Sequence, residues 1–332
     1  MDETRENSDD VLAGSPAPIK PAFEPPEDAP PSRLLAYLQL LRLPNVFTAM
    51  ADVLLGYLVT HGDLSPPAVF ACLLGSSSLL YLSGMALNDV FDREQDARER
   101  PTRPIPSGRV PLRVAQAMGW LMLLVGATLG WLAGCLATQW RAGVVASCLA
   151  AAVVLYDAVF KRTPLGPLGM GACRMLNVLL GASTVAGPLP QFMWVLAGGM
   201  GIYIAGVTWF ARTEAVASSR PQLAAALSVM LAGLAVIAWY PYWSEGAAEI
   251  APPSQWPIVW AIFGLIVANR CLRAVFDPRP ATVQVAVKMS ILAIVVIDAM
   301  ACFGALGQPF WPMIIVSLLL PTLLLGRWVY ST

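Results

Sequence analysis

Long apolar runs separated by short polar segments dominate the chain from residue 34 onward. A helix that crosses a bilayer needs about 20 mostly apolar residues. Breaks at charged or Pro- and Gly-rich positions give ten candidate spans: 34–60, 67–90, 112–134, 141–159, 167–187, 191–211, 221–242, 256–275, 281–303 and 309–329. These uninterrupted runs predict helices, because the strands of a membrane barrel alternate apolar and polar residues. The pattern therefore predicts an all-α, polytopic transmembrane bundle.

The composition narrows the class of protein further. Hydrophobic residues make up 57% of the chain and charged residues 13%, with a mean hydropathy of +0.63. A soluble domain is about 25% charged, so a soluble enzyme is excluded and the lipid bilayer is an expected partner. The net charge is zero, so no nucleic acid or other polyanionic partner is expected.

Three regions follow from this pattern. Residues 1–33 carry eight acids, and prolines cluster within 16–31, which predicts a disordered, acidic, Pro-rich cytoplasmic tail. Residues 34–303 form the expected bundle. Residues 309–329 form an additional transmembrane helix at the C-terminal end.

The distribution of basic residues predicts the orientation. Six arginines lie between the second and third spans, and further Lys and Arg residues follow spans four, six and eight. The loops on the opposite side carry one basic residue, Arg141. Because Lys and Arg concentrate in cytoplasmic loops, we expect both termini in the cytoplasm and the chain in the cell inner membrane.

A short pattern of Arg and Asn recurs in two spans. Arg42 and Asn45 have the spacing RxxN in the first span, and Arg174 and Asn177 have it in the fifth. A polar cytoplasmic segment follows one span after each. Two parallel halves of the bundle would place those segments on either side of one cavity.

Acidic and amide side chains recur at the cytoplasmic end of the second span. If that helix continues, Asn88, Asp92 and Asp96 lie on one face, because they are four residues apart. Their oxygen atoms suit a hard cation such as Mg²⁺. The alternative is a solvated helix end, although acids at a membrane boundary are usually functional.

An arginine-rich loop, residues 100–109, follows this segment with the sequence RPTRPIPSGR. Its prolines predict an extended loop that carries arginines beside the carboxylates. A metal ion and arginines together are suited to bind a diphosphate, since guanidinium groups form bidentate hydrogen bonds to phosphate oxygens.

At these residues the sequence resembles the UbiA superfamily of intramembrane prenyltransferases. The specific motifs are NDxxDxxxD, which begins at Asn88, and RPxPSG, which begins at Arg103. Weaker likenesses are the RxxN motif at 42–45, the Tyr and Lys-Arg segment at 156–162, and the loop at 277–280. The resemblance implies nine core helices around a cavity open sideways to lipid, so that 309–329 would be a tenth helix.

The resemblance also implies an activity and a site. Mg²⁺ would hold an isoprenyl diphosphate, whose prenyl group passes to an aromatic or other lipophilic acceptor. Asn88, Asp92 and Asp96 would hold Mg²⁺ and the diphosphate. Further diphosphate ligands would be Asn45, Arg103, Lys161 and Arg162.

One departure concerns the second acidic motif of the family, which should follow the sixth span. Glu214 is the only acid between residues 191 and 244, and Arg212 lies two residues before it. Glu214 is a poor site for a second Mg²⁺ by itself. Either Arg212 neutralises the diphosphate in place of that ion, as part of the catalytic set, or the site ionises substrates poorly. These changes resemble the divergent EboC branch, whose members belong to secondary-metabolite clusters.

Polar residues inside apolar spans have two interpretations. Gln284, Lys288 and Asp298 lie in the ninth span, and Arg174 and Asn177 in the fifth. Because a buried charge is costly, these side chains should face the cavity or each other. Arg174, Asn177 and Lys288 are candidate diphosphate ligands. The alternative is a salt bridge between helices, for example of Arg174 or Lys288 with Asp157 or Asp298.

A second functional hypothesis stays open. The same bundle could be a transporter or flippase for a prenylated or lipid-like metabolite, with its acids coupled to ions. The acids of 88–96 beside RPxPSG favour the enzyme, whereas the eroded second motif favours the transporter.

Overall fold

The computed structural model describes residues 33–213, 218–242 and 254–329, and every regular element within them is a helix. The long helices are α2 (Val46–His61), α3 (Pro67–Phe91), α5 (Leu112–Leu136), α6 (Arg141–Ala158), α7 (Gly166–Ala182), α8 (Gln191–Ala211), α9 (Arg220–Trp239), α10 (Trp256–Phe276) and α11 (Pro280–Leu306). The short ones are α1 (Arg33–Leu40), α4 (Arg93–Glu99), α12 (Phe310–Ser317) and α13 (Leu319–Trp328). Single 3-10 turns are η1 (Leu43–Asn45), η2 (Phe160–Arg162) and η3 (Tyr240–Tyr242). The predicted all-α transmembrane bundle is confirmed.

The spans agree with the sequence pattern, with three differences. Among the described residues, nine segments are long and apolar enough to cross a membrane. The expected span 167–187 is α7, which is shorter, with 17 residues. The expected span 34–60 is broken at Arg42, where φ is +44°, and the expected span 309–329 is divided into α12 and α13. Of the predicted tail, residues 1–33, only Arg33 is described, and it begins α1; residues 1–32 lie outside the described residues.

Proline marks the beginning of many helices. It occupies the first or second position of α3, α7, α9, α10 and α11. Proline is favoured there because the first turn has no carbonyl partner for its backbone N–H, and because its fixed φ suits a helix. The Pro- and Gly-rich breaks in the sequence therefore become helix starts.

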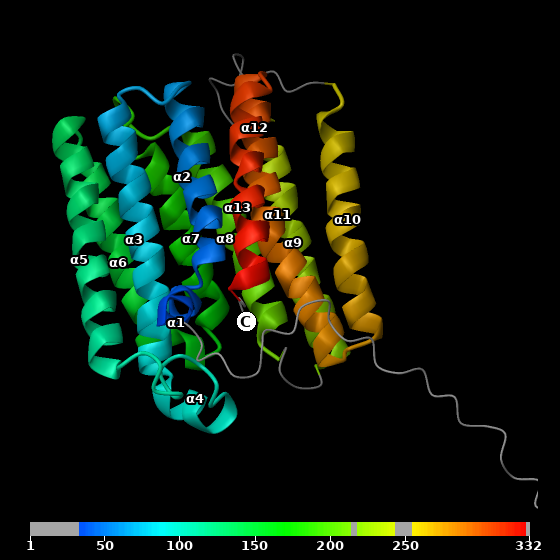
Figure 1. Cartoon of the computed structure of the whole chain (residues 1–332). Coiled ribbons are helices and arrows are strands. Elements are labelled where there is room, and N and C mark those ends of the chain that lie inside the picture. The colour runs from blue at the N-terminus through cyan, green and yellow to red at the C-terminus, as the bar shows by residue number, and fades with distance from the viewer. Residues whose placement is uncertain (1–32, 214–217, 243–253, 330–332) are drawn as a thin grey trace, which may run out of the picture. The chain divides into compact units, whose positions relative to one another are not determined.

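Helix α2 lies at the centre of the helix packing. It contacts α3, α7 and α11, and consecutive helices such as α7, α8 and α9 also lie side by side (Figure 1). One cluster of buried apolar residues joins α2 to α3, α5, α6 and α7, and a second joins α2 and α7 to α8 through α11. A polar side chain on α2 or α7 can therefore face both parts of the bundle.

Glycines allow α2 and α7 to pack backbone against backbone. A Cβ added to Gly56 would meet the carbonyl oxygen of Val178, and one added to Gly181 would meet that of Val53. Close packing through small residues is a common way to associate helices in a membrane. It brings the polar residues of these two helices within hydrogen-bonding distance.

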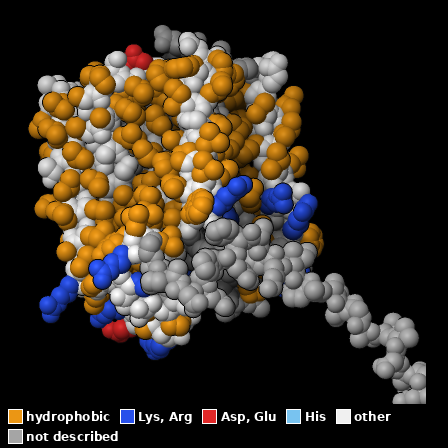
Figure 2. Space-filling view, viewed as in Figure 1, with side chains coloured by type: hydrophobic (Ala, Val, Ile, Leu, Met, Phe, Trp, Pro, Cys, Tyr) orange, Lys and Arg blue, Asp and Glu red, His pale blue; other side chains and the backbone are white. Residues whose placement is uncertain are grey.

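The outer surface agrees with insertion into lipid. Figure 2 shows a face that is hydrophobic over most of its height, with Lys and Arg side chains gathered toward its lower part. Large exposed apolar residues include Leu124, Leu265 and Phe276. The lower end in Figure 1 also carries α1, α4 and the end of α13, and α13 contacts η1. The chain is a multi-pass membrane protein with one strongly polar end.

Candidate functional site

The last turn of helix α3 places several polar residues at the polar end of the bundle. The helix ends at Phe91, and Asp92 adopts φ −90° and ψ 1° before α4 begins. The backbone hydrogen bonds nevertheless continue at four-residue steps, from Asp92 N–H to the Asn88 carbonyl and from Asp96 N–H to the Asp92 carbonyl. The shared face of Asn88, Asp92 and Asp96 was expected on the condition that the helix continues; the structure has two helices joined by a helical turn.

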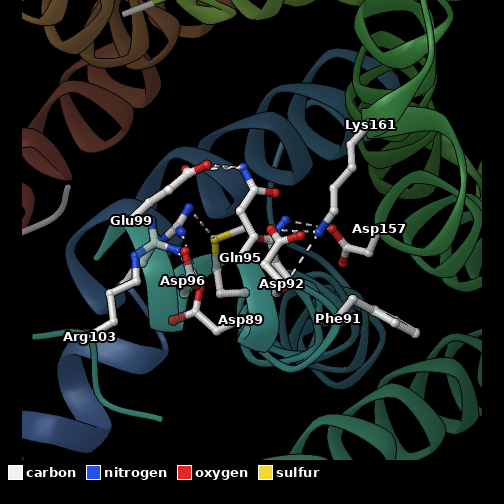
Figure 3. Close-up of polar contacts among 12 residues, drawn as sticks. Asp89, Phe91, Asp92, Gln95, Asp96, Glu99, Arg103, Asp157 and Lys161 are labelled. Carbon is white, nitrogen blue, oxygen red and sulfur yellow. Dashed lines mark hydrogen bonds and ion pairs between the residues drawn. The ribbon is translucent and has the colours of Figure 1, made fainter. Parts of the chain in front are cut away.

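The acids of this segment divide into two groups, as Figure 3 shows. In the first group, Arg103 Nη1 lies 2.7 Å from Asp96 Oδ2 and 3.4 Å from Asp89 Oδ1. Arg42 Nη2 lies 3.3 Å from the same Asp89 oxygen. Both carboxylates are buried and balanced by guanidinium groups.

The second group joins α3 to the end of α6 and to η2. Asn88 Nδ2 donates to Asp157 Oδ1 at 2.8 Å. Lys161 Nζ lies 2.8 Å from Asp92 Oδ2, and Arg162 Nη2 lies 3.3 Å from Asp92 Oδ1. The two groups together are called the terminal cluster below. It contains Arg42, Asn88, Asp89, Asp92, Asp96, Arg103, Asp157, Lys161 and Arg162.

The loop at 100–109 is a set of tight turns, so the expectation of an extended loop is wrong. Ser107 N–H donates to the Arg103 carbonyl, and Gly108 has φ +73°. Arg109 closes the loop by donating to the Thr102 carbonyl at 2.6 Å and to Gln39 Oε1 at 2.9 Å. Proline stabilises turns as well as extended segments, because it fixes φ near the value that turns need.

Two cavities adjoin the terminal cluster. A polar cavity of about 330 Å³ is lined by Gln39, Arg42, Asp89, Thr102, Arg103, Pro104 and Arg109. An apolar cavity of about 90 Å³ lies between α2, α3, α6 and α7. Asp157 and Tyr156 line it at the end nearest the terminal cluster, and Arg174 and Asn177 line it on α7. Asn45 lies beside the cavity residue Tyr81.

The terminal cluster offers oxygen ligands of the kind that Mg²⁺ prefers, although its carboxylates form ion pairs or hydrogen bonds with other side chains of the cluster in this structure. Asn88, Asp92 and Asp96 offer only oxygen ligands to a metal, which is the preference of a hard ion. Within the described residues, no group of three or more His, Cys, Asp or Glu side chains is gathered tightly enough to hold a metal ion. A diphosphate would offer the same cations an alternative anionic partner, which would free the carboxylates for the metal.

The second motif is only partly visible. Arg212 is exposed, and its Nη2 donates to the Thr163 carbonyl at 2.6 Å, directly after η2. Arg212 therefore lies near Lys161 and Arg162. The weak metal candidate Glu214 lies outside the described residues.

Arg174 and Asn177 lie deeper in the bundle than expected of diphosphate ligands. Arg174 Nη1 lies 2.6 Å from Asp52 Oδ2, and Arg174 Nη2 donates to Thr48 Oγ1 at 2.6 Å. Asn177 Nδ2 donates to Asp52 Oδ2 at 2.9 Å. The contacts of Arg174 match the alternative of a salt bridge between helices, but its partner is Asp52, not Asp157 or Asp298. We call Asp52, Arg174, Asn177 and Asp298 the interior cluster.

The candidate ligand Lys288 and the loop at 277–280, which resembles the family, remain to be placed. Lys288 is exposed on α11, whereas the sequence predicted that it would face inward. A lysine can expose its ammonium group while its aliphatic stem covers apolar surface, which removes the need for an inward partner. Asp277 follows α10, where hydrogen bonds from Arg279 lower the pKa of its carboxyl group.

Sequence reasoning did not single out Asp89 and did not place Asp52 or Asp157. All three are buried and paired with residues from other helices or loops. The available signal was an acid inside an apolar span, which is costly unless it has a partner. That signal marks such residues but does not identify the partner.

Comparison with known proteins gives a family match. The sequence model described as the UbiA prenyltransferase family matches residues 49–282. Digeranylgeranylglyceryl phosphate synthase of Halobacterium salinarum is 31% identical over 237 residues, which are 68% of this chain and 79% of that protein. The synthase of Methanococcoides burtonii is 33% identical over 136 residues, covering 39% of this chain and about half, 47%, of that relative.

Solved structures share the fold. One from work on digeranylgeranylglyceryl phosphate synthase in membranes has a TM-score of 0.61 and 20% identity, and covers 83% of this chain and 99% of that chain. A UbiA homologue from Archaeoglobus fulgidus, bound to GPP and Mg²⁺, has a TM-score of 0.59 and 15% identity. It covers 85% of this chain and 99% of its own.

Proposed function

This chain belongs to the UbiA prenyltransferase family, and we propose that it binds an isoprenyl diphosphate with Mg²⁺ and transfers the prenyl group to a lipophilic acceptor. The observation that carries this proposal is the terminal cluster. It places oxygen ligands and four basic side chains at one end of an apolar cavity. This arrangement suits a ligand with an anionic head and an apolar tail.

We assign the head of this ligand to the terminal cluster. Lys161 and Arg103 would bind phosphate oxygens, because both are largely buried and already hold an anionic group, with 11% and 13% of their side chains exposed. Arg42, beside Asp89, and Arg162, beside Asp92, would add positive charge on either side of the head group. Asn45, which lies beside Tyr81, would also bind the diphosphate.

Asn88, Asp92 and Asp96 would hold the metal ion on the same face. When bound, Mg²⁺ would neutralise the charge that develops on the leaving diphosphate. Asp89 and Asp157 would keep Arg42, Arg103 and Asn88 oriented when the other carboxylates change partner.

The apolar cavity would take the beginning of the prenyl chain. Met85, Val153 and Met170 are among the residues that line it, and Tyr81 and Tyr156 add aromatic faces. Exclusion of water would protect a prenyl cation, and aromatic rings would stabilise it. The sequence relatives are named for a glyceryl phosphate product. The proposed class of acceptor for this chain is lipophilic and includes aromatic compounds.

The same charge distribution supports an orientation. The terminal cluster, α4 and the arginine-rich loop all lie at one end of the bundle (Figure 1). We propose that this end is cytoplasmic, with both chain termini in the cytoplasm of a cell whose inner membrane holds the protein. Cysteine labelling of intact cells tests this: a cysteine at Glu94 should be protected, and one at Asp63 should react.

The transporter alternative has weaker support. The apolar cavity lies beside a cluster that suits diphosphate, and family membership favours prenyl transfer. A transporter of a prenylated metabolite would move its substrate without forming pyrophosphate.

The deciding experiment measures pyrophosphate release by the purified protein in lipid nanodiscs. Geranyl and longer isoprenyl diphosphates are supplied with Mg²⁺ or EDTA, each with a glycerophosphate lipid or an aromatic acid as acceptor. We expect Mg²⁺-dependent release together with a prenylated acceptor. Mg²⁺-independent binding without release, combined with movement of lipid across the bilayer, would support the transporter instead.

A further inference from the structure

The interior cluster contains more acid than base. Asp52 on α2 and Asp298 on α11 are both fully buried, with 0% of each residue exposed. Arg174 on α7 forms its ion pair with Asp52. Asp298 also lies close enough to interact with Asp52 and Arg174. Two carboxyl groups therefore share one guanidinium group inside a membrane-spanning bundle.

The hydrogen-bond donors around the carboxyl oxygens of Asp52 and Asp298 are distributed unevenly. Asp52 Oδ2 accepts hydrogen bonds from Arg174 at 2.6 Å and from Asn177 at 2.9 Å. Asp52 Oδ1 and both oxygens of Asp298 have no hydrogen-bond donor among the described residues. The two carboxyl groups nevertheless lie within hydrogen-bonding reach of each other.

The interior cluster lacks one positive charge. With both carboxyl groups ionised, the cluster would carry a net charge of −1, with three unpartnered oxygens on fully buried residues. An uncompensated buried charge is strongly unfavourable. One additional positive charge would make the cluster neutral and give the carboxyl pair a hydrogen bond.

We propose that this missing charge is a proton, and that Asp52 and Asp298 form a proton-binding site in the membrane interior. The proton lies between the two carboxyl groups, with Asp298 as the donor and Asp52 Oδ1 as the acceptor. Asp52 keeps the negative charge, because Arg174 and Asn177 hold its other oxygen. This assignment goes beyond prenyl transfer and does not depend on it.

A metal ion fits the site less well than a proton. A hard divalent cation takes about six or more oxygen ligands, whereas three carboxyl oxygens are unpartnered here. The Arg174 guanidinium beside them repels a second cation. Besides Asp52 and Arg174, Asp298 lies near Cys302 on its own helix, and a thiol is a poor ligand for hard ions.

The site joins the two parts of the bundle. Asp52 and Arg174 lie on α2 and α7, the helices shared by both apolar clusters, and Asp298 adds α11. Arg174 and Asn177 also line the apolar cavity. A neutral, hydrogen-bonded cluster would therefore fix the α7 wall of the cavity without placing a net charge beside it.

The proposal predicts that the cluster needs one negative charge, not two. Asp298→Asn keeps that charge and a donor, so the unfolding temperature in nanodiscs should change by less than about 2 °C. Asp52→Asn should cost only part of the stability, because Asp298 can ionise in its place. The double variant leaves Arg174 unbalanced, so its unfolding temperature should fall by about 10 °C. Adding Arg174→Gln to the double variant should recover most of that loss.

Infrared spectroscopy of the same samples detects the proton directly. The folded protein should show the carbonyl stretch of a protonated carboxylic acid, and Asp298→Asn should lose that band. Asp277→Asn, which changes a partly exposed aspartate outside the spans, is the matched control and should keep it. Each readout is independent of diphosphate, so a failed transferase assay would leave this test intact.

Three results would overturn the proposal. One is a spectrum of the parent protein without the band of a protonated acid. The second is an Asp298→Asn variant as unstable as the double variant, which would mean that Asp298 is ionised. The third is stabilisation of the parent, but not of Asp298→Asn, by sodium or another metal ion, which would identify a cation site instead.

Discussion

The terminal and interior clusters each contain a buried aspartate paired with an arginine of an RxxN motif, but in different surroundings. Arg42 in the first RxxN motif pairs with Asp89 at 3.3 Å, and 23% of its side chain is exposed. Arg174 in the second motif pairs with Asp52 at 2.6 Å, and 12% of its side chain is exposed. Beyond the Arg42–Asp89 pair, the terminal cluster adds as many bases as acids, namely Arg103, Lys161 and Arg162 with Asp92, Asp96 and Asp157. The interior cluster adds only a second acid, Asp298.

The two clusters differ in whether their side chains can exchange partners. In the terminal cluster, several cations surround acids at the membrane boundary, so an incoming anion and a metal ion can replace the existing pairs. In the interior cluster, Arg174 and Asn177 are tied to protein atoms on α2. The first arrangement suits ligand binding, and the second suits helix packing. Similar motif spacing therefore does not imply a similar role.

The largest expected effect is on the terminal cluster. Asp92→Ala or Asp96→Ala should reduce Mg²⁺-dependent turnover by about 100- to 1,000-fold, the range seen when one electrostatic stabiliser of a transition state is removed. Radiolabelled isoprenyl diphosphate binding should lose its Mg²⁺ dependence. Pyrophosphate release and filter binding measure the two effects.

Glu94→Gln is the matched control, because Glu94 is an exposed acid on the same short helix α4. It should retain turnover within about two-fold, as expected of a surface substitution. Parent-like Mg²⁺ dependence in the two alanine variants would remove the metal assignment from Asp92 and Asp96.

The second effect separates the clusters by stability. Gly56→Ala places a Cβ against the Val178 carbonyl, so α2 and α7 must move apart around the Asp52–Arg174 pair. We expect a loss of about 1–3 kcal/mol in unfolding free energy, the usual cost of overpacking. Diphosphate affinity should change much less, because the acids at the end of α3 are not displaced.

Gly264→Ala on α10 is the control for this substitution, since nothing lies within 4 Å of its added Cβ. It should leave stability unchanged or raise it by up to about 1 kcal/mol, because alanine favours a helix. Equal destabilisation by both variants, measured by thermal unfolding in nanodiscs, would mean that close α2–α7 packing is not what holds the interior cluster.

The sequence was most informative where the signal is local. Span positions follow from apolar runs, and the Arg103–Asp96 pair joins residues seven apart. The Lys161–Asp92 and Arg174–Asp52 pairs join residues 69 and 122 positions apart, so only helix packing brings them together. Lys288 was misplaced for the same reason: periodicity indicates which residues share a face, but not which neighbour covers that face.

The third effect compares two neighbouring cations of the terminal cluster. Lys161→Ala should weaken diphosphate binding by about 10- to 100-fold, because a largely buried hydrogen bond to a charged group contributes about 1.5–3 kcal/mol. Arg162 is 59% exposed, so Arg162→Ala should cost about five-fold or less. Titration of labelled diphosphate tests both, and the reverse order would place the head group at the exposed surface beside Arg162.

The smallest expected effect concerns the polar segment after α8. Arg212 donates to the Thr163 carbonyl from an exposed position, so it can orient η2 and add a positive charge near Lys161 that salt screens. We expect Arg212→Ala to weaken diphosphate binding about three-fold, and more at low salt than at high salt. Arg220→Ala is a matched control, because Arg220 is also exposed and donates to a carbonyl, that of Phe276, away from η2. If the two variants have equal affinity for diphosphate at low salt, Arg212 is a membrane-boundary anchor and does not replace the missing acidic motif.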